Sequence, residues 1–471
     1  MTNIMENHEY NFLWEKIYNQ YLQAIYCSLD KNRRMKKYFI IFLLATSTTL
    51  LLYCTRKDQV VLSSSADSNT LVSYKTTTPP VIDGNIDGEW SKATSISVTP
   101  TVPDPGNNLF TGYNGETYPA TLRSMYDDQY IYFLLEYADS TKSVNVAPWY
   151  FNTDTKLWAQ EPTSRTYDVN GKLTRQGHGE DKFAMLWNID FSTPKFISQT
   201  CYASCHVFTP YTDFSVNPPV SQSNAGSGNH YTNGASEKID MWWAHLSRDV
   251  LFNQMDDNYQ DWAGGPGVTN LVGGSGNGRH VDGIVVSGAN SKWPYSPSYT
   301  TAALQGASNN RQSLKLDGTG VSVNVPLWII PDASSYYYIL ATDTLPGGKA
   351  VKITGVSSTG VLSYNGGSIN PNVGTDYQRA GDAVFGGDGA KCFPGYIASP
   401  LVGGRADITC SAVYTGTGWV IEFKRKLRTD DTLKQDVDLS GLQDQQFGLA
   451  IWNQSNNQHG IQPNLLLKFQ R

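Results

Sequence analysis

The sequence predicts an all-β protein, an antiparallel β-sandwich with long loop insertions and a few short helices. Charged residues make up only 17% of the 471 residues, whereas aromatic residues reach 12% and glycine contributes 42 residues. Short runs of β-branched and aromatic residues are separated by Gly, Asn, Asp or Pro, a pattern typical of exported, turn-rich β proteins. The formal net charge of −6 gives no electrostatic reason to expect a nucleic acid as partner.

The N-terminal region predicts export. Residues 1–34 precede a better start at Met35, and we treat them as a misassigned extension outside the fold. Residues 35–54 have the layout of a secretory signal, with two lysines, an apolar run and then Cys54. Hydroxyl residues interrupt the apolar run, which is shorter than the ~20 residues that a membrane-spanning helix needs.

The signal resembles that of a bacterial lipoprotein, in which Cys54 becomes the lipidated first residue of the mature protein. Tyr53 stands where such signals carry a small residue, so an uncleaved anchor and a plain signal cut further along stay open as alternatives. We expect an exported protein, in the periplasm or at the cell surface, that an N-terminal lipid holds to a membrane.

The rest of the chain divides into a linker and a domain. The polar residues 55–78 are predicted as a linker, and residues 79–471 as one β-sandwich domain. A β-hairpin is predicted around the Asp127-Asp128 turn, and one helix over residues 237–248. Further strands are predicted in the runs KFAMLWNID, SVNVPLWII, YYYILATD, GWVIEFKRKL, FGLAIWNQS and NLLLKFQ.

One motif in the domain carries chemistry, Cys201-Tyr-Ala-Ser-Cys205-His206. A redox dithiol of the thioredoxin kind lies at a helix start within a βαβ unit, and no such pattern surrounds this motif. A structural zinc site needs four ligands, but the motif supplies three and the sequence has no second cysteine pair at this spacing. Cys392 and Cys410 are far away along the chain and could form a disulfide with each other.

Covalently bound haem accounts for every residue of the motif. Two nearby thiols can each add to a vinyl group of one porphyrin, and the adjacent histidine can then bind the iron axially. Three residues separate the cysteines here, one more than in the usual Cys-x-x-Cys-His motif. This attachment takes place outside the cytoplasm, which agrees with the export signal. The sequence therefore predicts one haem c, held by Cys201, Cys205 and His206.

A second axial ligand would come from a nitrogen or thioether donor elsewhere in the chain. His245 lies in an aromatic segment, where a hydrogen-bonded histidine packed against tryptophan is an equal alternative. Met185 lies on a predicted core strand, where a packed methionine is the simpler interpretation. The weaker candidates lie in Gly- or Asn-rich loops and are His178, His230, His280 and His459.

Several segments together resemble the haem-binding domain of ethylbenzene dehydrogenase-type γ subunits and related c-type cytochromes. They follow in the same order across residues 79–471 and are IDGNIDGEW, SMYDDQYIYFLLEYAD, EDKFAMLWNID, CYASCH, DMWWAHLSR, VDG, FPGYIASPLVGGRADITC, TGTGWVIEFKRKL and FGLAIWNQSNNQHG. The resemblance implies a β-sandwich similar to carbohydrate-binding modules, with the haem held in inserted loops. The γ subunits bind haem b through Met and Lys, whereas this sequence is similar to the relatives that carry the covalent motif.

The resemblance also implies roles for single residues. His245 falls where relatives tend to carry a lysine that can bind iron, and Met185 lies in the strand similar to the one that supplies a methionine ligand. With His206 as one axial ligand, only one of these two is needed on the other side of the haem.

Four neighbouring residues have looser roles. Trp242 and Trp243 could pack on the porphyrin, with packing in the core as the alternative. Arg248 could face a haem propionate or form a surface salt bridge. Asp240 could orient His245 through a hydrogen bond, as ligating histidines require, or cap the predicted helix.

The function that follows is electron transfer. We expect a mono-haem cytochrome that is not itself an enzyme, because the sequence offers no nucleophile, acid–base pair or cofactor loop. Its partner would be a molybdenum oxidoreductase, another cytochrome or a respiratory chain. The alternatives are a carbohydrate-binding or adhesion lipoprotein, which has no use for haem, and a haem-based ligand sensor, which leaves one iron position open.

Overall fold

The computed structural model describes most of the chain beyond the N-terminal signal and linker. The described residues fall in one compact unit, Asp67–Arg471. They are residues 69–104, 110–196, 200–204, 211–213, 220–222, 230–232, 234–262, 278–282, 308–331, 337–379 and 391–471. None of the helices among them is long and apolar enough to cross a lipid bilayer.

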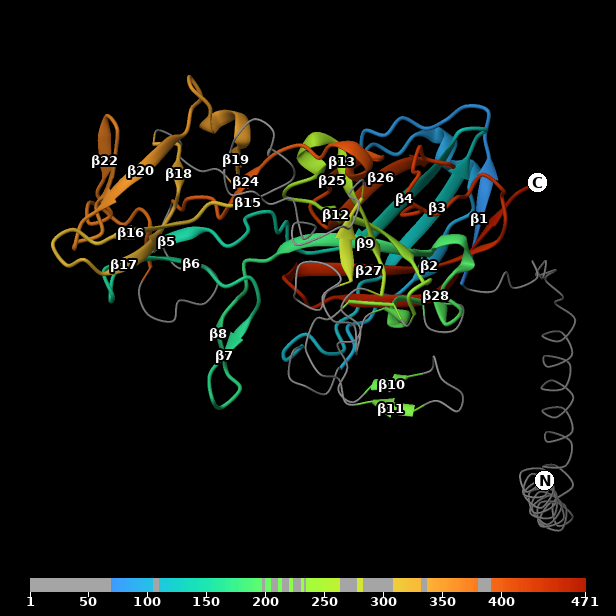
Figure 1. Cartoon of the computed structure of the whole chain (residues 1–471), viewed down its shortest axis with the longest axis horizontal. Coiled ribbons are helices and arrows are strands. Elements are labelled where there is room, and N and C mark those ends of the chain that lie inside the picture. The colour runs from blue at the N-terminus through green and yellow to red at the C-terminus, as the bar shows by residue number, and fades with distance from the viewer. Residues whose placement is uncertain are drawn as a thin grey trace, which may run out of the picture. The chain divides into compact units, whose positions relative to one another are not determined.

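Ten strands form a closed ring by pairing with their neighbours (Figure 1). In pairing order they are β1 (Thr70–Lys75), β28 (Gly460–Phe469), β27 (Gln445–Ser455), β9 (Glu180–Asn188), β12 (Ile239–His245), β13 (Gln254–Gln260), β25 (Ile408–Tyr414), β26 (Gly418–Lys426), β4 (Tyr130–Ala138) and β3 (Ala120–Tyr126). Two short strands, β2 (Ile96–Val98) and β14 (Arg279–Val281), pair with β3 and β13. The predicted all-β class is confirmed.

The ring closes because β1 pairs in parallel with both β28 and β3, whereas an open sandwich would leave an edge at this position. The prediction of a linker over residues 55–78 is therefore wrong for Thr70–Lys75. The strand is polar in sequence because one of its inward side chains is a serine. Ser73 is fully buried, and its hydroxyl accepts a hydrogen bond of 2.9 Å from Ser124.

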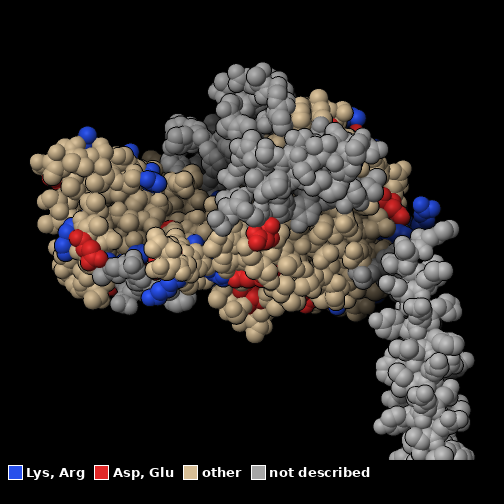
Figure 2. Space-filling view, turned by 90° about the horizontal axis from the view of Figure 1, so that it is seen from below, with Lys and Arg blue, Asp and Glu red and all other residues tan. Residues whose placement is uncertain are grey.

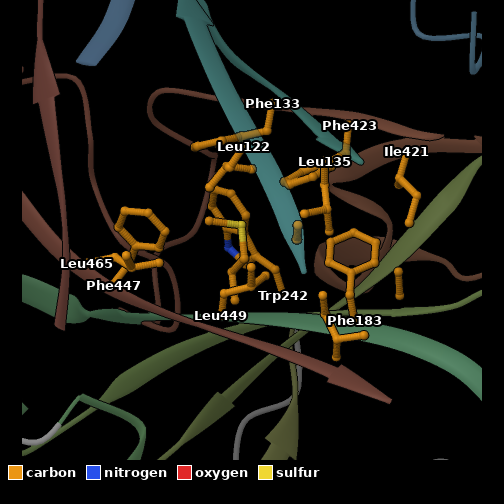
Figure 3. Close-up of a cluster of buried hydrophobic side chains, with 14 of the residues drawn as sticks. Leu122, Phe133, Leu135, Phe183, Trp242, Ile421, Phe423, Phe447, Leu449 and Leu465 are labelled. Carbon is orange, nitrogen blue, oxygen red and sulfur yellow. The ribbon is translucent and has the colours of Figure 1, made fainter. Parts of the chain in front are cut away.

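The interior of the ring is filled by apolar side chains from its two opposite halves (Figure 3). Phe133 of β4 and Phe423 of β26 stack with their ring centroids 5.1 Å apart. The Phe133 ring also lies 6.0 Å from both Trp187 of β9 and Trp242 of β12. Two halves of the ring thus pack face to face, as in a sandwich, and no strand edge is left at either side.

Truncating the centre of this core should cost much stability. We expect Phe133→Ala to lower the free energy of unfolding by about 3–5 kcal/mol, because its fully buried ring touches both halves of the ring of strands. Val413→Ala, on the exposed face of β25, should change it by less than about 0.5 kcal/mol. Urea unfolding of both variants measures the difference, and equal losses would contradict this account of the core.

A second set of small sheets has an apolar core of its own, centred on Trp149, Phe151, Trp158 and Phe393. The sequence predicted insertions here but not a separate core. The strands are β5 (Trp149–Asn152), β6 (Leu157–Gln160), β7 (Thr166–Tyr167), β8 (Leu173–Arg175), β15 (Ser308–Asn309), β16 (Gln312–Lys315), β17 (Ser322–Val325), β18 (Trp328–Ile329), β19 (Ile339–Leu340), β20 (Val351–Val356), β21 (Leu362–Tyr364), β22 (Gly367–Ile369), β23 (Gln378–Arg379) and β24 (Tyr396–Ala398). A further hairpin consists of β10 (Tyr211–Asp213) and β11 (Val220–Gln222).

The helical elements that can be bounded among the described residues are short 3₁₀ turns, and the helix predicted over residues 237–248 is wrong. Its central residues form β12, in which successive side chains point to opposite faces of the sheet. Both faces are buried, so the alternation of polar and apolar residues that marks a strand is missing. The turns are η1 (Gly88–Lys92), η2 (Ile189–Phe191), η3 (Thr200–Ala203), η4 (Val250–Phe252), η5 (Ala341–Thr344) and η7 (Gly403–Ala406).

The surface carries few charges. On the face that Figure 2 shows, lysine, arginine and acidic side chains are scattered among uncharged residues and form no large field of one sign. This agrees with the charged fraction of 17%. The arrangement gives no support to a nucleic acid as partner.

Candidate functional site

The turn η3, which contains Cys201, lies against the outer face of the sheet. The backbone N–H of Asn464 in β28 donates to the Thr200 hydroxyl at 2.7 Å, and that hydroxyl donates to the Asn464 side chain at 2.9 Å. Gly448 of β27 leaves the space for this contact, since a Cβ there would lie 2.9 Å from Thr200 Cγ2. Ala203 is fully buried in a small cluster with Ile239 of β12.

These contacts fix where the cysteine motif enters the fold. The backbone of Cys201 belongs to η3 and therefore lies beside β9, β27 and β28. Cys205 and His206 lie outside the described residues, as does Cys54 of the predicted lipidation site. Their predicted roles stay predictions.

The outer face of β9, β12 and β27 is lined by aromatic and apolar side chains. Met241, Trp452 and Ala184 are buried there, and Trp243 packs beside them. The Trp243 and Trp452 rings lie 5.9 Å apart and are tilted by 32°. This surface begins next to the cluster that holds Ala203, because Leu186 of β9 packs against both groups.

His245 lies at the end of β12 on this same outer face. Its ring packs on Trp243 with a centroid distance of 4.3 Å, and the residue is only 6% exposed. Its Nδ1 lies 2.5 Å from Oδ2 of Asp249. A carboxylate at Nδ1 holds the ring in place and directs Nε2 to any metal, which is the usual arrangement of a ligating histidine.

Asp249, and not Asp240, orients His245. The prediction for Asp240 rested on a helix, whereas in a strand residues 240 and 245 point to opposite faces. Asp240 instead accepts hydrogen bonds inside the ring from Arg425, at 2.7 Å, and from the backbone of Val437, at 2.8 Å. The signal in the sequence was an aspartate four residues beyond the histidine, in the turn that follows β12.

Met185 and Trp242 lie on the other side of the sheet. Both are fully buried in the core inside the ring, and they are direct partners in the β9–β12 pairing. The structure therefore brings His245 and Trp243 to one face, and Met185 and Trp242 to the opposite one. A single haem on the outer face would meet only the first pair.

Cationic side chains border the aromatic surface, and sequence reasoning missed them. The Lys182 ammonium lies 5.7 Å from the Trp243 ring and 5.4 Å from the Trp452 ring, and it donates to the Asn456 carbonyl at 2.8 Å. Burial lowers the pKa of Lys182 to about 7, although Glu180 opposes this shift. The Arg279 guanidinium lies 4.4 Å from the centre of the Trp243 ring.

Arg248 forms an ion pair with the buried Glu180 and lies 4.9 Å above the Tyr396 ring. Its Nε donates to Glu180 Oε2 at 3.1 Å, and the Ser247 hydroxyl donates to the same carboxylate. Of the two predicted roles the structure contains the salt bridge. Burial raises the pKa of Glu180, but Arg248 and His245 outweigh it and lower this pKa to about 2.

This lowered pKa predicts a pH dependence. A carboxyl with a folded pKa near 2 and an ordinary value of 4.5 stabilises the fold above pH 4.5, and the stabilisation is lost as the pH falls toward 2. We expect Glu180→Gln to remove about 3 kcal/mol near neutral pH, with a shrinking difference from the wild type below pH 4.5. Urea unfolding of both proteins from pH 3 to pH 7 measures this difference in the free energy of unfolding. A difference that does not change with pH would contradict a lowered pKa of Glu180.

The predicted disulfide is absent, because Cys392 and Cys410 are both free thiols. Cys410 is fully buried in the core of the ring, on β25. Cys392 lies near Asn145, whose side-chain amide donates to its sulfur at 3.4 Å. Burial raises the pKa of both thiols, which makes them poor nucleophiles.

Comparison with known proteins gives one family match. A family model described as "Ethylbenzene dehydrogenase" matches residues 87–319, which include the cysteine motif, β9, β12 and β13. The resemblance expected over residues 79–471 is thus supported for this part. No curated protein matches the chain.

Two matching solved structures are of a carbohydrate binding module family 9 from Caldicellulosiruptor kristjanssonii, one in complex with glucose and one with cellotriose. Each is 8% identical, and each alignment covers 85% of this chain with a TM-score of 0.24. The alignments cover 94% and 93% of the two modules. A likeness at this level carries no argument about function.

Proposed function

We propose that the protein is an exported mono-haem cytochrome c that transfers electrons and catalyses no reaction itself. One observation carries the proposal: the turn containing Cys201 of the Cys201–His206 motif is anchored on the sheet face that presents His245 and Trp243. The family match over residues 87–319 supports a role in or beside an oxidoreductase. Attachment of haem c takes place outside the cytoplasm, so the proposal includes export and a lipid anchor at Cys54.

The described residues fit a porphyrin on this face. Flat rings of Trp243 and Trp452 provide an apolar surface, and Lys182 and Arg279 beside them would pair with propionate carboxylates. His245 is held by Asp249 with its Nε2 available for a metal, opposite the ligand that His206 would provide. The bound haem would supply reversible one-electron chemistry.

The protein itself would bind the haem, orient its histidine ligand and shield the group from water. The sheet fixes the position of His245, and the buried aromatic surface excludes water, which tunes the potential of a haem group. The partner would be a molybdenum oxidoreductase, another cytochrome or a respiratory chain. The fold would hold its redox group near this partner at a membrane.

The proposal is tested by expressing the chain from Met35 with the c-type haem maturation machinery. We expect low-spin absorption spectra in both redox states, no change on adding carbon monoxide, and rapid reoxidation of the reduced protein by an oxidised cytochrome. A high-spin protein that binds carbon monoxide would contradict electron transfer and favour a haem-based ligand sensor. A protein that matures without haem would contradict the proposal altogether.

A further inference from the structure

Four buried aspartates meet at one end of the ring, on the inner side of the sheet. Asp240 comes from β12, Asp257 from β13, Asp282 from the residue after β14, and Asp436 from the loop between β26 and β27. The first three residues are at most 4% exposed, and the side chain of Asp436 is 5% exposed. This cluster lies on the face opposite to His245 and takes no part in the proposed haem site.

The charges within this aspartate cluster do not balance. Arg425 of β26 is the cation that pairs with it, with Nη1 at 2.7 Å from Asp240 Oδ2, 3.5 Å from Asp257 Oδ2 and 3.8 Å from Asp436 Oδ1. Four carboxylates facing one guanidinium leave a large excess of negative charge when all are ionised. Buried charges are costly unless they are paired or coordinate a metal.

Five carboxylate oxygens of the cluster have no hydrogen-bond partner. One oxygen from each of Asp240, Asp257 and Asp436 lies within 4.8 Å of the others. Oδ1 of each of these three residues is buried and makes no hydrogen bond. Asp282 lies outside this group of three, yet both of its buried oxygens also lack a hydrogen-bond partner.

Asp282 lies within hydrogen-bond reach of Asp436. Its pKa is raised well above the usual value, by burial first, then by the charge of Asp257, by a carboxyl–carboxyl hydrogen bond with Asp436, and by the charges of Asp436 and Asp240. Its backbone N–H also donates to the Asp257 carbonyl at 3.3 Å. A buried carboxylate that receives no N–H or hydroxyl hydrogen bond and lies beside Asp436 is a second sign that a cation belongs in this cluster.

We propose that a Ca²⁺ ion binds between Asp240, Asp257, Asp282 and Asp436. The donors are all oxygens, which suits a hard cation and not zinc or copper. Ca²⁺ binds oxygen at about 2.3–2.6 Å, so its ligands can lie up to about 4.6–5.2 Å apart, and the three carboxylate oxygens lie within 4.8 Å of one another. Mg²⁺ dehydrates reluctantly and is less often bound by protein oxygens alone.

The ion would join separate parts of the fold. Asp240 and Asp257 belong to two adjacent strands, whereas Asp436 belongs to a loop that follows β26. Binding would therefore hold the 427–444 loop against the end of the core. The predicted consequence is a stability that depends on calcium, independent of any haem.

The test uses the haem-loaded wild type after treatment with EGTA, titrated with CaCl₂ in a calorimeter and followed by thermal unfolding. We expect one Ca²⁺ per chain, a rise in Tm on adding Ca²⁺, and a weaker or absent response to MgCl₂. In Asp257→Asn and Asp282→Asn the affinity should fall ~10-fold or more. The control is Asp438→Asn. Asp438 is an exposed carboxylate of the same loop that pairs with Arg428, and its replacement should leave the Ca²⁺ affinity unchanged.

The alternative to a bound ion is that the carboxyls share protons and no ion binds. The results below distinguish the two. In EGTA we expect Asp257→Asn to be at least as stable as the wild type, because it removes one of several buried carboxylates that share the single guanidinium of Arg425. A wild type whose Tm is the same in EGTA and in CaCl₂ would overturn the proposal. Equal affinity in Asp257→Asn, Asp282→Asn and wild type, or tighter binding of Mg²⁺ than of Ca²⁺, would also overturn it.

Discussion

Replacing Cys201 and Cys205 together with alanine abolishes covalent haem attachment, according to the proposed function. Each thioether bond needs one of these thiols, so the doubly substituted protein has no site for either bond. Haem-dependent staining after denaturing electrophoresis should fall from one haem per wild-type chain to background. The ring of strands should still form, because neither cysteine is part of one of its ten strands.

Cys392→Ala provides the matched control. This thiol is free and lies by Asn145, in a part of the fold that does not belong to the proposed site. Its replacement should leave the haem content of the denatured protein unchanged. Covalent haem that persists in the Cys201 and Cys205 double variant would refute attachment at this motif.

Replacing His245 with alanine should convert a low-spin haem into a high-spin one. The residue is 6% exposed, packed on Trp243 and held by Asp249. Loss of an axial nitrogen leaves the iron with an open position. Absorption spectra of the oxidised and reduced protein would show the change, and carbon monoxide would then bind.

Met185→Leu is the control for the His245 variant. Met185 is fully buried in the core on the opposite face of the sheet, and leucine fills a similar volume. The spectrum of this variant should equal that of the wild type. A spectrum that changes with Met185→Leu and not with His245→Ala would reverse the assignment of the second ligand.

The strands that form the centre of the ring could be predicted from the sequence. The runs KFAMLWNID, GWVIEFKRKL, FGLAIWNQS and NLLLKFQ form β9, β26, β27 and β28, and the hairpin around Asp127 forms β3 and β4. These runs are rich in apolar residues and end at turn residues. Thr70–Lys75 was missed because its inward residues are only partly apolar, and β12 because both of its faces are buried.

The candidate site was predictable only where it rests on a motif. The cysteine pair is a local pattern, whereas the surface around His245 combines residues from β9, β12, β14 and β27. Lys182, Arg279 and Trp452 come together through strand pairing across long stretches of sequence. Asp240 was assigned to the wrong face because a helix and a strand present the same residues in different directions.

The central claim is that the chain carries one covalent haem at Cys201 and Cys205. The most direct measurement is the mass of the denatured full-length protein, produced with the haem maturation machinery, followed by mass analysis of its peptides. We expect one haem per chain, located on the peptide that contains Cys201, Cys205 and His206. A protein of unmodified mass, with both thiols free to react with an alkylating reagent, would contradict the account.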